Sequence, residues 1–325
     1  MKPLYLLIFF FFSFSVSAQN QLGGDIDGET SGDESGWAVS SSSDGNIIAI
    51  GARRNSGNGS ESGSVRVYQY SNGIWIQLGS DIDGEASDDQ SGWSVSLSSD
   101  GTILAIGAIK NDGSSNDAGH VRVYEFVNGN WIQLGGDING ASSGDWFGFS
   151  LSLSDNGTIL AIGAYLSDVN GNKSGQVKVY EYSNNTWAQL GSNINGEAAD
   201  HKSGASVSLS DDGSILAIGA RGVNMGGGRV KVYKYNNVIG SWVQRGYDLD
   251  GQGGDNFGRS VSLSSDGTIL AIGGDEHDGN GINSGYVKVY EFVNGLGWTQ
   301  LGSDIDGDNS YNYFGHSISL SDGFP

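Results

Sequence analysis

The sequence predicts an all-β protein, a β-propeller of four-stranded antiparallel blades, and three observations support this prediction. A unit of 56 residues recurs, because the glycine of the phrase QLG, or QRG in one copy, returns at steps of 56, 56, 56, 55 and 56 residues. Bulky residues alternate with small ones in short runs, which is the period of half-buried strands. The chain has 55 glycines and no proline between Pro3 and Pro325. A fixed period of this length indicates stacked copies of one supersecondary unit.

The second repeat shows the four strands most clearly. We expect them at residues 92–98, 102–108, 120–126 and 131–135, and name them A, B, C and D in chain order. The Asp100-Gly101 pair after strand A is typical of a two-residue hairpin turn. Asn128-Gly129 predicts the same kind of turn between strands C and D. Four strands that each pair with their sequence neighbour form one propeller blade.

The period divides the chain into a leader and one propeller domain. We place a signal peptide at residues 1–18 and the propeller domain at residues 19–325. The repeats span residues 24–79, 80–135, 136–191, 192–246 and 247–302, with a partial repeat at 303–325. We therefore expect five complete blades with an incomplete closure, truncated from a parent of six or seven blades.

The first 18 residues have the pattern of a secretory signal. One lysine precedes a short apolar run, and Ser17 and Ala18 provide a small-residue cleavage site. No later segment has the roughly 20 apolar residues that a membrane-spanning helix needs. The sequence has no cysteine, so packing and not disulfides must hold the fold. We predict a secreted or cell-surface protein, monomeric and without membrane insertion.

Three phrases resemble a known repeat. Residues 147–164, 257–274 and 314–323 each open on Phe-Gly and continue into the Ser-Asp-Gly or Asp-Asn-Gly turn that follows strand A. They are similar to the FG-GAP repeat in its secreted bacterial variety, and the same repeat builds the propeller of integrin α subunits. The resemblance implies a bacterial source and a propeller, often of seven blades, that serves extracellular adhesion or ligand binding.

Two features depart from the family pattern. No proline follows the Gly-Ala at the end of strand B. In addition, the calcium-binding members carry an aspartate-rich loop between strands A and B, whereas this chain has only a short turn there. Calcium is therefore not expected at the usual position of the family.

The acidic residues concentrate in two kinds of loop. The formal net charge is −21, and in a meander the B–C and D–A loops lie at one end of the blade while the A–B and C–D turns lie at the other. Since most acids fall in the B–C and D–A loops, we predict an acidic loop face. Such a surface attracts cations and basic partners and repels nucleic acid. Solubility is the alternative explanation of the charge.

The D–A loops carry a D-x-D-G phrase and a further acid, and this spacing suggests calcium ligands. Ca²⁺ takes six to eight oxygen ligands from carboxylates, amides and carbonyls. The alternative is that each aspartate caps backbone N–H groups of its own turn. The candidate ligands are Asp25, Asp27, Asp33, Asp81, Asp83, Asp89, Asp137, Asn139, Asp145, Asp248, Asp250, Asp255, Asp304 and Asp306.

Few residues break the repeat in a way that a catalytic site would require. His120 precedes a C strand, His201 and Lys202 lie in one D–A loop, and residues 275–278 form an acidic cluster with one histidine. That cluster suits a metal or acid–base site, or simply a solvated loop. Four histidines and no cysteine assemble no catalytic motif of known spacing. We therefore predict that the protein is not an enzyme.

One position of the repeat varies in a way that suggests ligand binding. The residue after the strand A glycine is aromatic in three copies and is Ala205, Arg259 or His316 in the others. Because strand A is innermost, these side chains could ring the mouth of the central channel, although packing against the next blade is the alternative. The candidate ligand-binding residues are Trp37, Trp93, Phe149, Arg259 and His316.

Other aromatic residues recur without variation and predict the core between blades. They are Trp75, Trp131, Trp187, Trp242 and Trp298, with Tyr68, Tyr124, Tyr180, Tyr233 and Tyr290. Taken together, the sequence favours a secreted, non-enzymatic propeller that recognises an extracellular polysaccharide or protein. A propeller lyase or hydrolase acting on glycans, and a structural spacer that displays another domain, are the alternatives.

Overall fold

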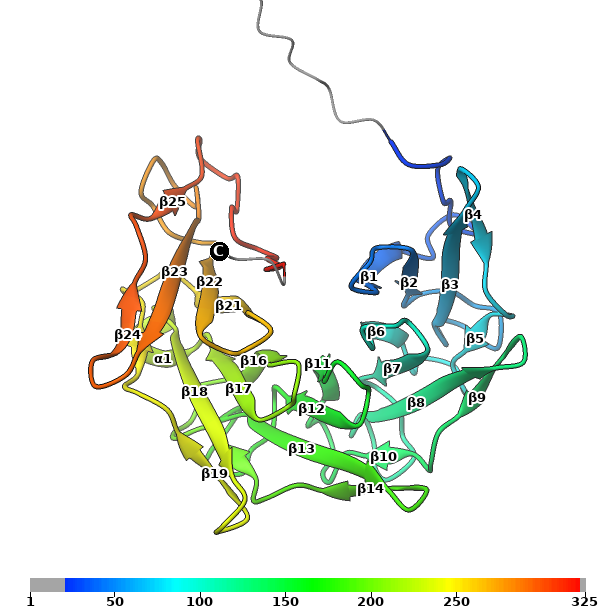
Figure 1. The fold of residues 1–325 in the computed structure, drawn as a ribbon, viewed down its shortest axis with the longest axis horizontal. Coiled ribbons are helices and arrows are strands. Elements are labelled where there is room, and N and C mark those ends of the chain that lie inside the picture. Colours follow the sequence, from blue (N-terminus) through cyan, green and yellow to red (C-terminus); the bar gives the residue numbers. More distant parts are fainter. Residues whose placement is uncertain (1–20, 322–325) are drawn as a thin grey trace, which may run out of the picture.

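The computed structural model describes residues 21–321 and contains five sheets, each an antiparallel meander of four strands. The first blade consists of β1 (Ser35–Ser41), β2 (Ile47–Ala52), β3 (Ser64–Ser71) and β4 (Ile74–Gln77). Figure 1 shows the blades side by side in an arc, with the first and last blades at its two ends. The first strand of each blade faces the centre and the fourth lies at the rim. The predicted all-β propeller is confirmed.

The other four blades repeat this plan. The second has β6 (Ser91–Leu97), β7 (Ile103–Ala108), β8 (His120–Val127) and β9 (Asn130–Gln133). The third has β11 (Phe147–Leu153), β12 (Ile159–Ala164), β13 (Gln176–Ser183) and β14 (Thr186–Gln189). The fourth has β16 (Ser203–Leu209), β17 (Ile215–Ala220), β18 (Arg229–Asn236) and β19 (Ser241–Gln244). The fifth has β21 (Phe257–Leu263), β22 (Ile269–Gly274), β23 (Tyr286–Val293) and β24 (Gly297–Gln300).

A fifth, two-residue strand in every sheet was not predicted. These strands are β5 (Ile82–Asp83), β10 (Ile138–Asn139), β15 (Ile194–Asn195), β20 (Leu249–Asp250) and β25 (Ile305–Asp306). Each comes from the D-x-D-G phrase and pairs with the start of strand C, as Ile82 does with Val65. Ile82 is buried, so this short pairing anchors the acidic loop to the blade before it. Two residues are too few to show a period of two in the sequence.

The described part of the chain holds one helix, α1 (Val223–Gly226), in the B–C loop of the fourth blade. It is not long and apolar enough to cross a membrane. The predicted signal peptide, residues 1–18, lies outside the described residues.

The innermost strands are joined by their serines, which explains why the small residues of strand A are so often serine. Ser94 Oγ donates to the carbonyl of Gly148 on the next blade at 2.6 Å, and Leu153 N donates to Ser96 Oγ at 3.0 Å. The register shifts at the start of every strand A, where a glycine such as Gly92 has φ 85°. A bulge of this kind turns the following side chain toward the channel mouth.

The hydrophobic core lies between neighbouring blades. Val65 and Val67 of the first blade pack with Leu104 and Ile106 of the second, and all four are buried. Trp131 packs against the same cluster and donates its indole N–H to the carbonyl of Leu78 at 2.8 Å. The recurring tryptophans and tyrosines thus lie at the blade interfaces, as predicted. Since no blade encloses a core of its own, each depends on a neighbour for its stability.

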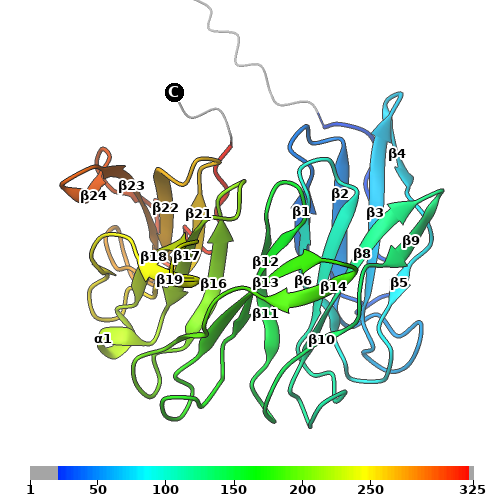
Figure 2. The same ribbon diagram turned by 60° about the horizontal axis from the view of Figure 1, so that its bottom comes forward.

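The tight turns and the long loops lie on opposite faces, as the meander predicts. On the turn face, Ser43 N donates to the carbonyl of Ser99 and Ser99 N donates to that of Asp155, so successive A–B turns are hydrogen-bonded along the arc. On the loop face, the B–C and D–A loops contact each other, as where Asn58 Nδ2 donates to the carbonyl of Gly84. Figure 2 shows α1 and the long loops together at one end of the blades.

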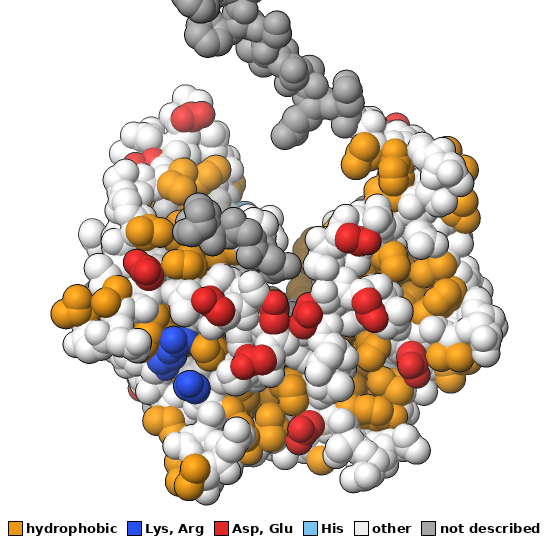
Figure 3. Space-filling model, in the orientation of Figure 1, with side chains coloured by type: hydrophobic (Ala, Val, Ile, Leu, Met, Phe, Trp, Pro, Cys, Tyr) orange, Lys and Arg blue, Asp and Glu red, His pale blue; other side chains and the backbone are white. Residues whose placement is uncertain are grey.

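The negative charge is not confined to the loop face, where the sequence predicts it, but is present on the turn face as well. Bases on strand C pair with acids of the loop face, as Lys288 does with Asp304 at 3.4 Å and Arg122 does with Glu85 at 3.4 Å. These bases are therefore not available to neutralise the turn face, where the A–B turns carry Asp44 among other aspartates. Figure 3, viewed with α1 on the far side, shows acidic side chains across this face and few basic ones. Both faces are acidic, and solubility explains the charge of the turn face.

Candidate functional site

Three of the predicted ligand-binding residues form a continuous aromatic strip across the first three blades. The Trp37 and Trp93 rings lie 5.1 Å apart, and the Trp93 and Phe149 rings lie 5.6 Å apart. Trp37 is 47% exposed, whereas Trp93 and Phe149 are half-buried. Trp37 and Trp93 therefore each pack against a ring of the next blade, which was the alternative prediction, and Phe149 packs against Trp93 of the blade before it. All three rings still present a surface to solvent.

Arg53 caps the open end of this strip. Its guanidinium carbon lies 3.6 Å from the centre of the Trp37 ring and 4.7 Å from that of Trp93, the geometry of a cation–π contact. Arg53 Nε also donates to Glu34 Oε2 at 2.6 Å. Arg53 stands directly after strand B, a position that was not predicted to be part of the site.

The strip continues with residues that the sequence did not identify. Tyr165 stacks on Phe149 with ring centres 4.4 Å apart, and Trp146 lies 6.4 Å from Phe149 at an interplanar angle of 15°. Arg221 donates a hydrogen bond to the Tyr165 hydroxyl and lies over the Tyr165 ring. Tyr165 and Arg221 directly follow strand B in their blades, as Arg53 does in the first blade. This position varies among the repeats, so comparing the repeats with one another could have identified these residues.

The other end of the site is polar and includes the remaining two candidates. His316 Nδ1 lies 2.7 Å from Asp275 Oδ2, and His316 Nε2 lies 2.8 Å from Arg259 Nη2. Asp275 is 3% exposed and also accepts a hydrogen bond from Asn256 Nδ2 at 2.7 Å. Burial lowers the pKa of Arg259, and the nearby Arg221 lowers it further. Arg221, which is near enough to lower the pKa of Arg259, also lies over the Tyr165 ring at the aromatic end.

We call the whole set the mouth strip. Its members are Trp37, Arg53, Trp93, Trp146, Phe149, Tyr165, Arg221, Arg259, Asp275 and His316. Ala205, the fourth copy of the aromatic position, is buried and adds no polar or aromatic group.

A third variable position has an unusual backbone. The residue two places before the bulge glycine has φ between 49° and 58° in all six copies, yet none is glycine. This left-handed conformation costs a non-glycine residue about 1–2 kcal/mol. The six residues are Glu34, Gln90, Trp146, Lys202, Asn256 and Tyr313. The backbone at this position is therefore repeated in every blade, while the side chain that it carries differs from blade to blade.

The predicted cluster at residues 275–278 is divided by the structure. Asp275 belongs to the mouth strip, whereas His277 Nδ1 lies 2.9 Å from Asp255 Oδ1. Asp278 Oδ1 accepts a hydrogen bond from the backbone of Asn283 at 2.8 Å. These residues therefore do not form a single site.

The predicted calcium ligands have structural hydrogen bonds. The first acid of the D-x-D-G phrase accepts from the glutamine at the end of strand D, as Asp81 does from Gln77 at 2.6 Å. The same pairing holds for Asp25, Asp137, Asp248 and Asp304. The second position lies on the two-residue strand at Asp83, Asn139, Asp250 and Asp306, and Asp27 offers its carbonyl to Arg66.

The last acid of the D–A loop is buried in four of the loops, at Asp33, Asp89, Asp145 and Asp255. Asp89 accepts from Ala86 N at 3.0 Å and from Asn111 Nδ2 at 3.0 Å, and so fastens the D–A loop to the B–C loop. Asp33 and Asp255 make equivalent contacts, and burial raises the pKa of Asp145. Within residues 21–321, no D–A loop brings three of its own acids within ligand distance of one point. Calcium binding stays a prediction, and its test is the melting temperature in millimolar calcium and in chelator.

Comparison with known proteins agrees with this architecture. A family model described as the FG-GAP repeat matches residues 26–68, 139–180 and 247–290. Comparison with curated proteins gives no match. Kuenenia stuttgartiensis hydrazine synthase is similar over 86% of this chain and 69% of its own, with a TM-score of 0.54 and 15% identity. A putative 6-phosphogluconolactonase from Bacteroides uniformis is similar over 84% of this chain and 86% of its own, with a TM-score of 0.50 and 14% identity.

At these identities the two solved structures bear on the fold alone. The repeat matches fall in the first, third and fifth blades, and the second and fourth blades have the same strands in the same order. The chain is therefore an FG-GAP repeat protein with the β-propeller fold.

Proposed function

We propose that this protein is a non-enzymatic binding propeller that holds an extracellular polysaccharide at the mouth strip. The observation that carries the proposal is the aromatic run from Trp37 through Trp93 to Phe149, contributed by three blades. Exposed aromatic faces suit the apolar faces of sugar rings, and a few placed polar groups fix their orientation. Arg53, Arg259 and His316 supply such groups beside the rings.

A protein ligand is the second possibility within the same function. Aromatic and arginine side chains are enriched in protein interfaces as well. The strip is narrow, however, since it uses one to three residues from each blade, and an extended chain fits it better than a broad globular surface. The signal peptide predicted at residues 1–18 places such a ligand outside the cytoplasm.

An enzyme acting on a glycan is the alternative that one observation favours. The buried Asp275 carboxylate holds His316 at 2.7 Å, beside Arg259, at the end of the strip. A carboxylate–histidine pair can move a proton to or from a bound ligand. Loss of polysaccharide chain length during incubation would support this alternative, whereas unchanged chain length supports binding alone.

Affinity electrophoresis through gels that contain soluble polysaccharides tests the proposal. We expect one class of polysaccharide to retard the protein, and Trp93→Ala to weaken that binding by about 2 kcal/mol, or roughly thirtyfold, because the central ring of the strip is lost. Val238→Ala is the control, since Val238 is 94% exposed in the C–D turn on the opposite face. Equal retardation of Trp93→Ala and the parent protein would refute the site.

A further inference from the structure

We propose a second site, independent of the mouth strip, that binds a divalent transition-metal ion such as Zn²⁺ between the first and second blades. Its ligands are Glu85, His120 and Asp137. One ligand atom from each side chain lies within 4.8 Å of the other two. Glu85 lies on the D–A loop that enters the second blade, His120 opens β8, and Asp137 precedes β10.

The distances suit a small ion. Because the three atoms lie within 4.8 Å of one another, a point exists that is no more than about 2.8 Å from each of them. Zinc needs about 2.0–2.2 Å to nitrogen and oxygen ligands, so each side chain has to move by well under 1 Å. Glu85 and Asp137 are exposed and can make this movement at little cost.

His120 is what distinguishes this group from an ordinary cluster of acids. Its side chain is 2% exposed, and within residues 21–321 neither ring nitrogen makes a hydrogen bond. The polar contact that it does make is long, with Nδ1 3.8 Å from Glu85 Oε2. Imidazole nitrogen is the commonest metal ligand among side chains, and no hydrogen bond from the described part of the chain to this ring competes with a metal ion.

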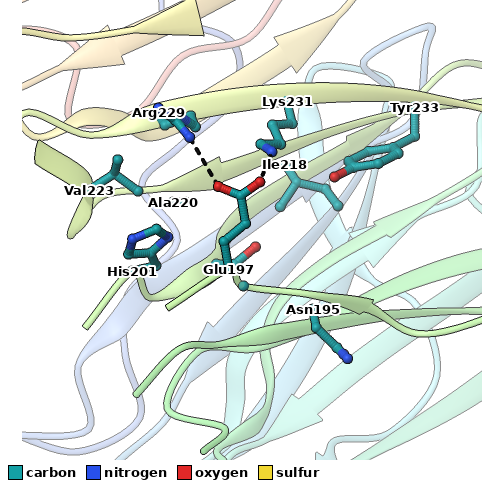
Figure 4. Close-up of a pocket in the computed structure, with 11 residues that line it drawn as sticks. Asn195, Glu197, His201, Ile218, Ala220, Val223, Arg229, Lys231 and Tyr233 are labelled. Carbon is teal, nitrogen blue, oxygen red and sulfur yellow. Dashed lines mark hydrogen bonds and ion pairs between the residues drawn. The ribbon is translucent and has the colours of Figure 1, made fainter. Parts of the chain in front are cut away.

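The fourth blade shows one way in which this place is filled. There Arg229 stands in the position of His120, Glu197 in that of Glu85, and Asp248 in that of Asp137. Arg229 Nη1 lies 3.0 Å from Glu197 Oε2 and 2.9 Å from Asp248 Oδ2, so the guanidinium bridges the two carboxylates. Figure 4 shows Arg229 and Lys231 converging on Glu197.

The second blade has the same two carboxylates without the bridging cation. Arg122 is the counterpart of Lys231, and it lies 3.4 Å from Glu85 Oε1 and donates to the carbonyl of Asp83. The other oxygen, Glu85 Oε2, is the one nearer to His120. Gln133 Nε2 donates a hydrogen bond to Asp137 Oδ1, so Asp137 Oδ2 is the oxygen that can bind a metal ion. An external cation would therefore take the place that the Arg229 guanidinium holds in the fourth blade.

The donor set indicates the kind of metal. One imidazole nitrogen and two carboxylate oxygens suit Zn²⁺ and its neighbours in the first transition series, whereas Ca²⁺ prefers oxygen alone. With three protein ligands and exposed carboxylates, a fourth position is open to water. The site differs from the calcium sites predicted in the D–A loops, because it takes residues from two loops and a strand.

Calorimetric titration of the untagged protein with ZnCl₂ tests the proposal. We expect one Zn²⁺ per chain, an affinity at least tenfold lower for Glu85→Gln and for Asp137→Asn, and a loss of binding in His120→Arg. The last variant copies the fourth blade, so it supplies an internal cation and retains a known packing. His201→Gln is the matched control, because it removes a histidine elsewhere and should leave the titration unchanged.

Cobalt gives a second readout that does not depend on stability. Co²⁺ bound through an imidazole in a four-coordinate site absorbs visible light, and we expect this band in the parent protein and its absence in His120→Arg. Excess Ca²⁺ should not displace the ion. The proposal is overturned if the parent protein takes up no Zn²⁺, or if His120→Arg binds Zn²⁺ as tightly as the parent protein does.

Discussion

At the scale of single residues, the aspartates of the A–B turns show how a short motif is made rigid. Asp44 accepts from Ser42 Oγ at 2.7 Å and from Asn46 N at 2.9 Å, and these hydrogen bonds lower its pKa. At Asp100 and Asp212, burial acts in the opposite direction but the hydrogen bonds outweigh it. The third blade has Asn156 in this position, with its amide oxygen accepting the same bonds.

These turns predict a defined response to acid. A carboxylate with a lowered pKa in the folded state stabilises the protein above its unfolded pKa, near 3.8, and loses that contribution as the pH falls through the folded value. When the pH is lowered below about 4, we expect the melting temperature of the parent protein to decrease. The decrease should be smaller in the quadruple variant D44N, D100N, D212N and D266N. Thermal melts between pH 5 and pH 2.5 test this. Parallel curves for both proteins would contradict it.

The candidate site could be predicted in part at this scale. The residue after the strand A glycine identified Trp37, Trp93, Phe149, Arg259 and His316 because it varies where the rest of the repeat does not. Arg53, Tyr165 and Arg221 were missed, since their contacts depend on how the residue after strand B is placed against strand A and against the neighbouring blade. The hydrogen bonds of the loop aspartates include the backbone caps that were the predicted alternative, as where Asp89 accepts from Ala86 N.

At the scale of elements, the close approach of the next blade to strand B explains why a glycine, such as Gly107, recurs near the end of that strand. A β-carbon at Gly107 would lie 2.3 Å from the carbonyl oxygen of Gly148 on the next blade and 2.4 Å from Ser94 Oγ. The innermost strands therefore approach strand B too closely for any side chain. The strands themselves were predictable from alternation and from Asp-Gly and Asn-Gly turns, whereas this contact between blades leaves only an unexplained glycine in the sequence.

Substitution of Gly107 should disturb the contact between the second and third blades. We expect Gly107→Ala to destabilise the protein by about 1–3 kcal/mol, because overpacking displaces the backbone of the next blade. Gly136→Ala is the control, since its β-carbon would meet no atom within 4 Å, and the change should stay within about 0.5 kcal/mol. Denaturant unfolding of both variants measures the difference. Similar midpoints for the two would argue against the close contact.

At the scale of the whole molecule, the first blade differs from the blades that follow it. Val39 on β1 is 59% exposed, whereas Val207 and Val261, in the same position of the fourth and fifth blades, are 8% exposed. The interior blades cover this valine with the preceding blade. The first blade of the described arc therefore presents an apolar face that its neighbours bury.

An exposed face of this kind should lead to association between molecules. We expect sedimentation velocity to show larger species as the protein concentration rises, and Val39→Ser to shift the distribution toward the monomer. Ile132→Ser is a suitable comparison, because Ile132 is 55% exposed on the rim strand β9 and not on the end face. A monomer at all concentrations would contradict the prediction.

The backbone hydrogen bonds between successive A–B turns have a consequence for how such a chain can change. Ser43 donates to Ser99, Ser99 to Asp155, and Asp155 to Asp211, in every case through main-chain atoms. Because these bonds do not depend on which side chain is present, each blade can follow any other without loss of register. Copies can therefore be exchanged, duplicated or deleted as units, and a rearranged chain would inherit an intact scaffold with a different order of side chains around its channel.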